Sequence, residues 1–163
     1  VGQTFKLESV SLQEILAPII ASTSAIAQDQ NIELKTEIPD DLPPIQGNHK
    51  ALQEVLTNLL DNAIKYTPQQ GTIEVAISND KPNQQGIIIR DNGAGIPPED
   101  QPNIFQRHYR GVQSEGDIPG TGLGLAIARD YVEQMQGTIE LISPAVPPEN
   151  PTHGTAFVVW LNQ

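Results

Sequence analysis

The sequence predicts a two-layer α+β fold, in which a mixed, mostly antiparallel sheet carries helices on one face. Three observations favour this class. Helical and strand-like patterns both occur, several strands follow one another in hairpin-like pairs, and neither an internal repeat nor a linker divides the chain. At 163 residues, the chain is long enough for one well-packed domain and too short to expect two. We therefore expect residues 1–163 to form a single domain.

The first helix is expected over residues 12–28. Ser11 and Glu14 in "SLQE" have the spacing of a capping box, and apolar residues recur after them at helical intervals. Pro18 removes one backbone hydrogen bond and is expected to kink this helix. The segment "NIELKTEI" then alternates apolar and polar residues as a strand does, and "PDDLPP" ends it.

A second helix is expected to begin after Asn48, which can cap it, and to end before Pro68 and Gly71. Between these residues, apolar side chains recur with the period of a helix and predict a buried face. The apolar positions are Leu52, Val55, Leu56, Leu59, Leu60, Ala63 and Ile64.

One edge of this second helix is unusually polar. At about 100° per residue, Glu54, Asn58, Asn62 and Lys65 gather along one flank of the apolar arc, and Tyr66 lies just inside it. A solvated helix boundary would explain any single asparagine. Four side chains that can form hydrogen bonds on one flank indicate a binding site instead.

The rest of the chain predicts four strands and one further helix. The segment 91–121 lacks a sustained period, so we expect a long loop with a turn of helix near Ile104. Gly137 is expected to stop the helix. The expected elements are strands at 73–77, 87–90, 138–143 and 155–161, a turn over "NDKPNQQG", and a helix over 122–136.

Composition excludes several classes of function. The net charge of −11, with nine Lys and Arg residues, argues against nonspecific nucleic-acid binding, which needs a basic face. The absence of cysteine excludes disulfides and thiolate metal sites. No apolar run reaches the roughly 18 residues of a membrane-spanning helix. We expect a soluble cytoplasmic domain without direct membrane contact, cut from a longer parent that could carry a membrane anchor.

Two glycine-rich segments suggest where a ligand binds. "DNGAGIP", residues 91–97, follows a strand; it has the chemistry of a plain turn, but its glycines would also let a ligand approach the backbone. "GTGLGLAIAR", residues 120–129, opens a helix with three alternating glycines. Bare amides at a helix N-terminus form a ready phosphate site.

The glycine run also raises the alternative of a dinucleotide-binding fold, since Glu140 lies twenty residues beyond Gly120, where a ribose-binding acid is expected. That fold needs a strand before the glycines, and "RGVQSEGDIP" has no apolar run to form one. Leu125 also occupies the position of the third glycine. The sequence therefore disfavours this alternative.

In order along the chain, "NLLDNAIKYT", "DNGAGIP", "IFQRHYRG" and "GTGLGLAIAR" resemble the N, G1, F and G2 boxes of sensor histidine kinases. These boxes belong to their ATP-binding catalytic domain, within the superfamily that includes gyrase and mismatch-repair ATPases. The resemblance covers essentially all of residues 5–162 and implies a Bergerat-type ATP-binding fold.

The resemblance implies roles for the polar edge of the second helix. Asn62 matches the asparagine that binds Mg²⁺, and Asn58, Lys65 and Tyr66 would face the phosphates of ATP. Asp91 matches the aspartate that accepts a hydrogen bond from the adenine amino group. Asn58 and Lys65 are thus implied to take part in catalysis.

The remaining boxes imply further nucleotide contacts and a nucleotide lid over residues 107–120. Arg110 matches the arginine that reaches the γ-phosphate and would stabilise charge in the transition state, with Arg107 as a second candidate. The other implied nucleotide-binding residues are Gly93, Gly95, Ile96, Gly120, Thr121, Gly122, Leu123, Gly124 and Thr155.

No phosphoacceptor histidine is recognisable. His49, His108 and His153 all lie outside the context of an acceptor at the head of a long amphipathic helix. The implied function is to bind Mg²⁺-ATP and phosphorylate a histidine on a dimerisation domain absent from this chain, for onward transfer to a response regulator. The fragment should be monomeric and should not phosphorylate itself.

Two alternatives to this function stay open. One is a nucleotide-binding module whose lid changes the affinity for a partner without phosphotransfer. The other is a serine kinase similar to anti-sigma factors, which the full F box and the long lid disfavour.

Overall fold

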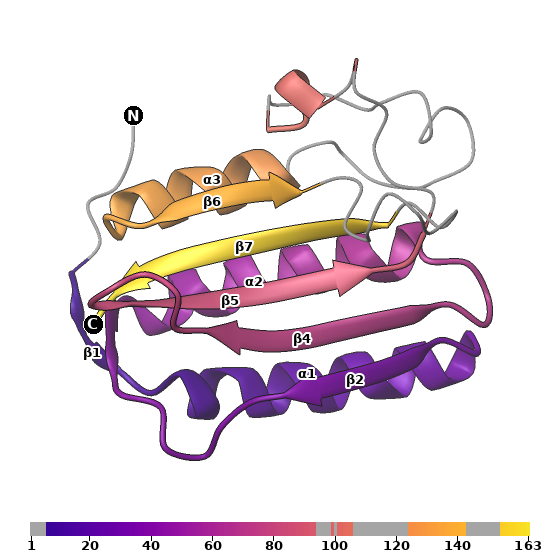
Figure 1. The fold of residues 1–163 in the computed structure, drawn as a ribbon, viewed down its shortest axis with the longest axis horizontal. Coiled ribbons are helices and arrows are strands. Elements are labelled where there is room, and N and C mark those ends of the chain that lie inside the picture. The colour runs from indigo at the N-terminus through magenta and orange to yellow at the C-terminus, as the bar shows by residue number, and fades with distance from the viewer. Residues whose placement is uncertain (1–5, 94–98, 100, 106–123, 143–153) are drawn as a thin grey trace.

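The computed structural model describes residues 6–93, 99, 101–105, 124–142 and 154–163, and it forms two layers (Figure 1). One layer is a five-stranded sheet, in which only the first pair of neighbouring strands is parallel. Its spatial order is β2 (Glu33–Glu37), β4 (Thr72–Ser78), β5 (Gln84–Asp91), β7 (Thr155–Asn162) and β6 (Thr138–Ile142). The other layer holds α1 (Leu12–Asp29), α2 (His49–Tyr66) and α3 (Gly124–Gln134) on one face of the sheet. The predicted α+β class is confirmed.

Helix α2 is the centre of the helical layer and contacts α1, α3 and β5. Asn48 caps it as predicted, since its Oδ1 accepts a hydrogen bond from the backbone N–H of Ala51 at 3.0 Å. Its predicted apolar face is buried in the core. The buried residues are Ala51, Leu52, Val55, Leu56, Leu59, Leu60, Ala63 and Ile64.

Helix α1 begins where the capping box predicted. The Oγ of Ser11 accepts a hydrogen bond from the backbone N–H of Glu14 at 3.4 Å. The helix continues through Pro18 to Asp29, and Asn31 then takes a left-handed φ of 59°. Neither α1 nor any other helix in the described part of the chain is long and apolar enough to cross a membrane.

Two short strands were not predicted. β1 (Glu8–Val10) pairs antiparallel with β3 (Ile45–Gly47) and forms a separate two-stranded sheet. The sulfur of the fully buried Met135 accepts a hydrogen bond from the backbone N–H of Asn48 at 3.4 Å. This contact joins the start of α2 to the segment that follows α3.

The end of α3 differs from the prediction. The helix ends at Gln134, and the left-handed residue that follows it is Gln136, with φ 65°, rather than Gly137. Gly137 N–H donates to the carbonyl of Val132 at 2.9 Å, which completes the C-terminal cap. A Cβ on Gly137 would overlap the carbonyl oxygen of Trp160, so close packing on β7 explains this glycine.

Strand β5 begins at Gln84, three residues before the predicted start at residue 87. The turn is correspondingly shorter, and Asn83 takes a left-handed φ of 60° within it. Gly86 lies against the ring of Trp160, where an added Cβ would come within 2.7 Å of a ring carbon. The aromatic ring therefore covers the glycine across the strand pair.

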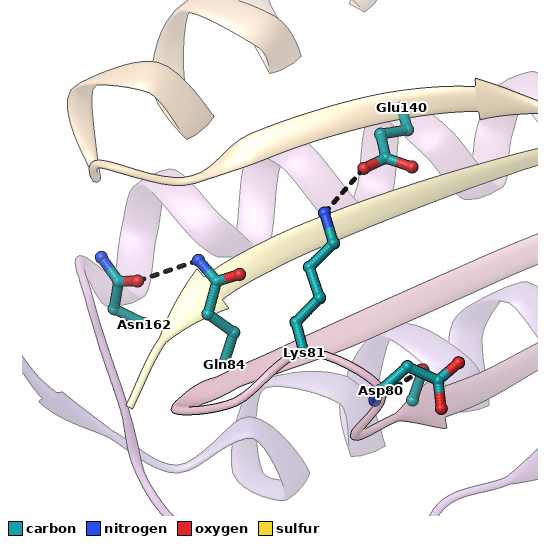
Figure 2. A network of polar contacts seen from close by, with 6 residues as sticks. Asp80, Lys81, Gln84, Glu140 and Asn162 are labelled. Atoms are coloured by element: carbon teal, nitrogen blue, oxygen red, sulfur yellow. Dashed lines mark hydrogen bonds and ion pairs between the residues drawn. The ribbon is translucent and has the colours of Figure 1, made fainter.

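Polar contacts connect neighbouring segments at the end of the sheet where β5 begins (Figure 2). The Nζ of Lys81 lies 2.9 Å from Oε1 of Glu140 and 4.6 Å from the ring centroid of Trp160. The Nε2 of Gln84 donates to Oδ1 of Asn162 at 2.9 Å. The opposite end of β5 carries Asp91, so these contacts lie far along the strand from it.

Candidate nucleotide-binding site

Asn58, Asn62 and Lys65 lie within about 60° of one another around the axis of α2, at about 100° per residue. The two asparagines are half-buried and Lys65 is exposed. The Nδ2 of Asn58 donates a hydrogen bond to the carbonyl oxygen of Gly124 at 3.3 Å. This bond joins the polar edge of α2 to the first residue of α3, so two motifs 66 residues apart meet here.

Asn62 is suited to hold a metal ion together with a phosphate. No group hydrogen-bonds to its half-buried amide within the part of the chain that the structure describes. No cluster of three or more acidic or histidine side chains among the described residues could hold a metal. Mg²⁺ accepts amide oxygen, phosphate oxygen and water together, so a single amide beside a triphosphate fits this ion.

Asp91 ends β5 with its side chain turned away from solvent; the residue is only 8% exposed. Its Oδ1 accepts a hydrogen bond from the backbone N–H of Gly93 at 2.9 Å, and Thr155 lies opposite it on β7. Burial raises the pKa of this carboxyl from 3.8 to about 6, although hydrogen bonds with the backbone of Gly93 and Thr155 oppose the shift. The fold therefore holds the carboxylate of Asp91 at the end of β5, although burying its charge costs free energy.

The backbone packs tightly around Asp91. A Cβ on Gly93 would overlap the carbonyl oxygen of Tyr66, the last residue of α2. Gly154 takes a left-handed φ of 68°, donates its N–H to the carbonyl of Gly93 at 2.8 Å, and would place a Cβ 2.5 Å from the carbonyl oxygen of Asp91. The ends of α2 and β5 and the start of β7 thus meet without intervening side chains.

The structure thus brings together two groups of predicted residues, and their proposed roles stay predictions. Asn58 contacts Gly124, while Asp91, Gly93, Thr155 and Tyr66 form the second group. Sequence reasoning missed Gly154, although a glycine just before a buried strand is a known signal of close backbone approach. The predicted lid and eight site residues lie outside the described residues: Gly95, Ile96, Arg107, Arg110, Gly120, Thr121, Gly122 and Leu123.

The structure also has an open surface recess of about 420 Å³ at the corner between α1 and β2. It contains none of the predicted site residues and lacks the buried carboxylate. We therefore place the candidate site at Asp91 and the edge of α2. The recess is lined by Gln28, Asn31, Ile32, Glu33, Gln70 and Gly71.

The sheet order and the one-sided helical layer define a two-layer α+β domain. The structure of the mycobacterial sensor histidine kinase MprB matches it with a TM-score of 0.82 and 29% identity, over 95% of this chain and 97% of that one. Residues 47–163 match the family described as histidine kinase-, DNA gyrase B-, and HSP90-like ATPase. The chain belongs to this family.

Two further proteins are similar to this chain. The sensor histidine kinase Hik2 of Synechocystis sp. is 46% identical over 167 residues, which cover 98% of this chain and 38% of that protein. The chain thus spans a little more than a third of the length of this relative. Full-length ShkA in complex with AMPPNP matches 99% of this chain with a TM-score of 0.80, and at 22% identity this likeness shows the fold alone.

Proposed function

We propose that the chain binds Mg²⁺-ATP and donates the γ-phosphoryl group to a histidine on the dimerisation domain of its parent protein. A response regulator aspartate would then receive the phosphoryl group. One observation carries the proposal: a buried carboxylate, Asp91, lies at a strand end beside bare glycine backbone. Membership of the ATPase family and the likeness to sensor kinases support it.

Asp91 would select adenine. Its ionised carboxylate can accept a hydrogen bond from the amino group of adenine, whereas guanine presents a carbonyl oxygen at that position and would be repelled. Because the residue is buried, its bond to a ligand is exchanged with water less readily than a surface bond. The lack of a side chain at Gly93 lets the backbone beside Asp91 pack directly against the carbonyl oxygen of Tyr66, which keeps the carboxylate close to the end of α2.

The phosphates would lie along the edge of α2. Asn62 would bind Mg²⁺ through its amide oxygen, and the bound ion would neutralise charge on the triphosphate. Lys65 is exposed and makes no ion pair with a described residue, so its ammonium group is available to a phosphate. Because the net charge of the chain is −11, a local cation such as Lys65 is important for attracting an anion. Arg110 would contact the γ-phosphate, with Arg107 as a second candidate.

Calorimetry with Mg²⁺-ATP, Mg²⁺-ADP and Mg²⁺-GTP tests the binding step. We expect ATP and ADP to bind and GTP to bind at least about tenfold more weakly. Asp91→Ala should remove a charge-assisted bond of about 1.5–3 kcal/mol, which lowers the affinity for ATP about tenfold or more.

Asp80→Ala is the matched control, because it removes an exposed acid from the turn before β5. This variant should bind ATP as the unchanged chain does. Equal affinities for ATP and GTP would overturn the assignment of Asp91. ATP binding without phosphotransfer to any acceptor histidine would favour the regulatory-module alternative.

A further inference from the structure

Asn92 follows Asp91 and bonds to both backbone groups of one residue on the neighbouring strand. Its backbone N–H donates to the carbonyl of Thr72 at 3.2 Å, and its side-chain Oδ1 accepts from the backbone N–H of Thr72 at 2.8 Å. The regular pairing of β4 with β5 ends at Ile73 and Asp91. The half-buried side chain of Asn92 therefore extends the strand pair by one residue.

The same side chain also contacts the segment that leaves α2. A Cβ on Gly71 would lie 2.9 Å from Oδ1 of Asn92 and would overlap the methyl group of Thr67. Thr67 is itself fixed to the last turn of α2, because its Oγ1 donates to the carbonyl of Ala63 at 2.7 Å. Asn92 thus lies where the end of α2, the start of β4 and the end of β5 meet.

This junction lies between the two halves of the candidate site. Asn62 and Lys65 lie on the last turns of α2, whereas Asp91 lies on β5. Gly93, on the other side of Asn92, packs on the carbonyl of Tyr66 and donates to Asp91. A shift of the residue between Asp91 and Gly93 would therefore move the carboxylate relative to α2.

We propose that Asn92 is a positioning residue for nucleotide binding: its side chain holds Asp91 and Gly93 in register with the C-terminal end of α2. This inference rests on the proposed function, because the register of β5 with α2 matters for a nucleotide that contacts both of these elements. The carboxylate of Asp91 would bind the base, and Asn62 would bind the metal ion. Both groups must be held to within a fraction of an ångström for one nucleotide to contact them together.

Three variants separate positioning from general stability. Asn92→Ala removes the acceptor for the N–H of Thr72, and Asn92→Asp keeps an oxygen acceptor at the same place. Asn162→Ala is the matched control, since it removes side-chain hydrogen bonds at the other end of β5, one from Gln84 (Figure 2) and one to the carbonyl of Gln136. Asn92→Ser, which keeps a weaker acceptor, replaces Asn92→Ala if that variant does not fold.

The first readout is the dissociation constant for Mg²⁺-ATP, measured well below the melting temperature of every variant. We expect it to rise about tenfold in Asn92→Ala, to stay within about threefold in Asn92→Asp, and to be unchanged in Asn162→Ala. Two results would overturn the proposal: Asn92→Ala binding ATP normally, or Asn92→Asp and Asn162→Ala binding as weakly as Asn92→Ala.

The second readout needs no nucleotide. Hydrogen exchange of the Gly93 and Thr72 amides, followed by NMR, should be faster in Asn92→Ala than in Asn162→Ala. If the unchanged chain fails to bind ATP, the proposed function fails, but these rates still test whether Asn92 holds the junction. Equal rates at both amides in the two variants would refute the positioning role.

Discussion

Gly93 donates its backbone N–H to the Oδ1 of Asp91 at 2.9 Å, inside a buried strand end. This bond favours the ionised carboxylate, but burial favours the neutral acid and has the larger effect, so the pKa is about 6. Asp91 is therefore mostly ionised at neutral pH and titrates just below it. Both nucleotide binding and stability should depend on this titration.

Lowering the pH should weaken ATP binding through Asp91. A protonated carboxyl cannot accept the hydrogen bond from adenine, so the affinity should fall about tenfold per pH unit below about pH 6. Calorimetry between about pH 5 and pH 8 measures this fall. Asp91→Asn serves as the control, because any pH dependence of the ATP affinity that this variant retains comes from the titration of ATP or of other groups. Parallel profiles for the two proteins would contradict the proposed role of Asp91.

The same titration should make Asp91→Asn the more stable protein at high pH. Since the folded-state pKa is raised from 3.8 to about 6, the folded state binds the proton more tightly, and ionised Asp91 lowers stability as pH rises through this window. The cost reaches about 3 kcal/mol above pH 6. Urea denaturation should show the variant to be more stable at pH 8 by up to that amount, with the difference vanishing near pH 4. A less stable variant at pH 8 would argue against the raised pKa.

Two glycines in the predicted boxes should respond differently to alanine. At Gly93 the new methyl group would overlap the carbonyl of Tyr66, so Gly93→Ala should cost about 1–3 kcal/mol and abolish ATP binding. At Gly124, the first residue of α3, the methyl group would in contrast meet only Asn58 among the described residues, at 3.9 Å. Gly124→Ala should leave the stability unchanged or raise it by up to ~1 kcal/mol. Thermal melts of both variants check the pair, and equal destabilisation would be inconsistent with the packing described.

The isolated chain should hydrolyse ATP very slowly. In gyrase-like ATPases, the resemblance places a glutamate that activates water where this chain has Asn58, and an amide cannot take a proton from water. The missing general base is worth about 10²–10⁴-fold. Glu54 is exposed and lies about 6 Å further along the helix axis, so it should not replace that base. Phosphate release measures the rate; fast hydrolysis that survives Asn58→Ala would favour an energy-coupled ATPase instead.

Helix α2 was predictable because several local signals agree. Asn48 caps it, its apolar residues keep one period for its whole length, and Pro68 follows its end. The fold class was predictable for the same reason, since strand pairs and helices each leave a clear pattern. The strand end at Asp91 was also visible, because a turn motif follows an apolar run.

Contacts between distant segments could not be predicted in this way. β1 and β3 are three residues each, too short for a period, and each exists only because it pairs with the other. The bond from Asn58 to Gly124 and the bonds between Asn92 and Thr72 depend on how the layers pack. Asn92 looked like ordinary turn chemistry in the sequence, and only the structure shows what its side chain holds.

Phosphotransfer in trans tests the central claim most directly. The chain is mixed with the dimerisation domain of its parent protein and with ATP labelled at the γ-phosphate, and the label on each protein is measured with and without acid treatment. We expect acid-labile phosphate on a histidine of the dimerisation domain and none on this chain. Asn62→Ala should abolish the labelling, while the control Asn162→Ala should retain it. Label on this chain itself, or ATP binding without any labelled histidine, would contradict the account.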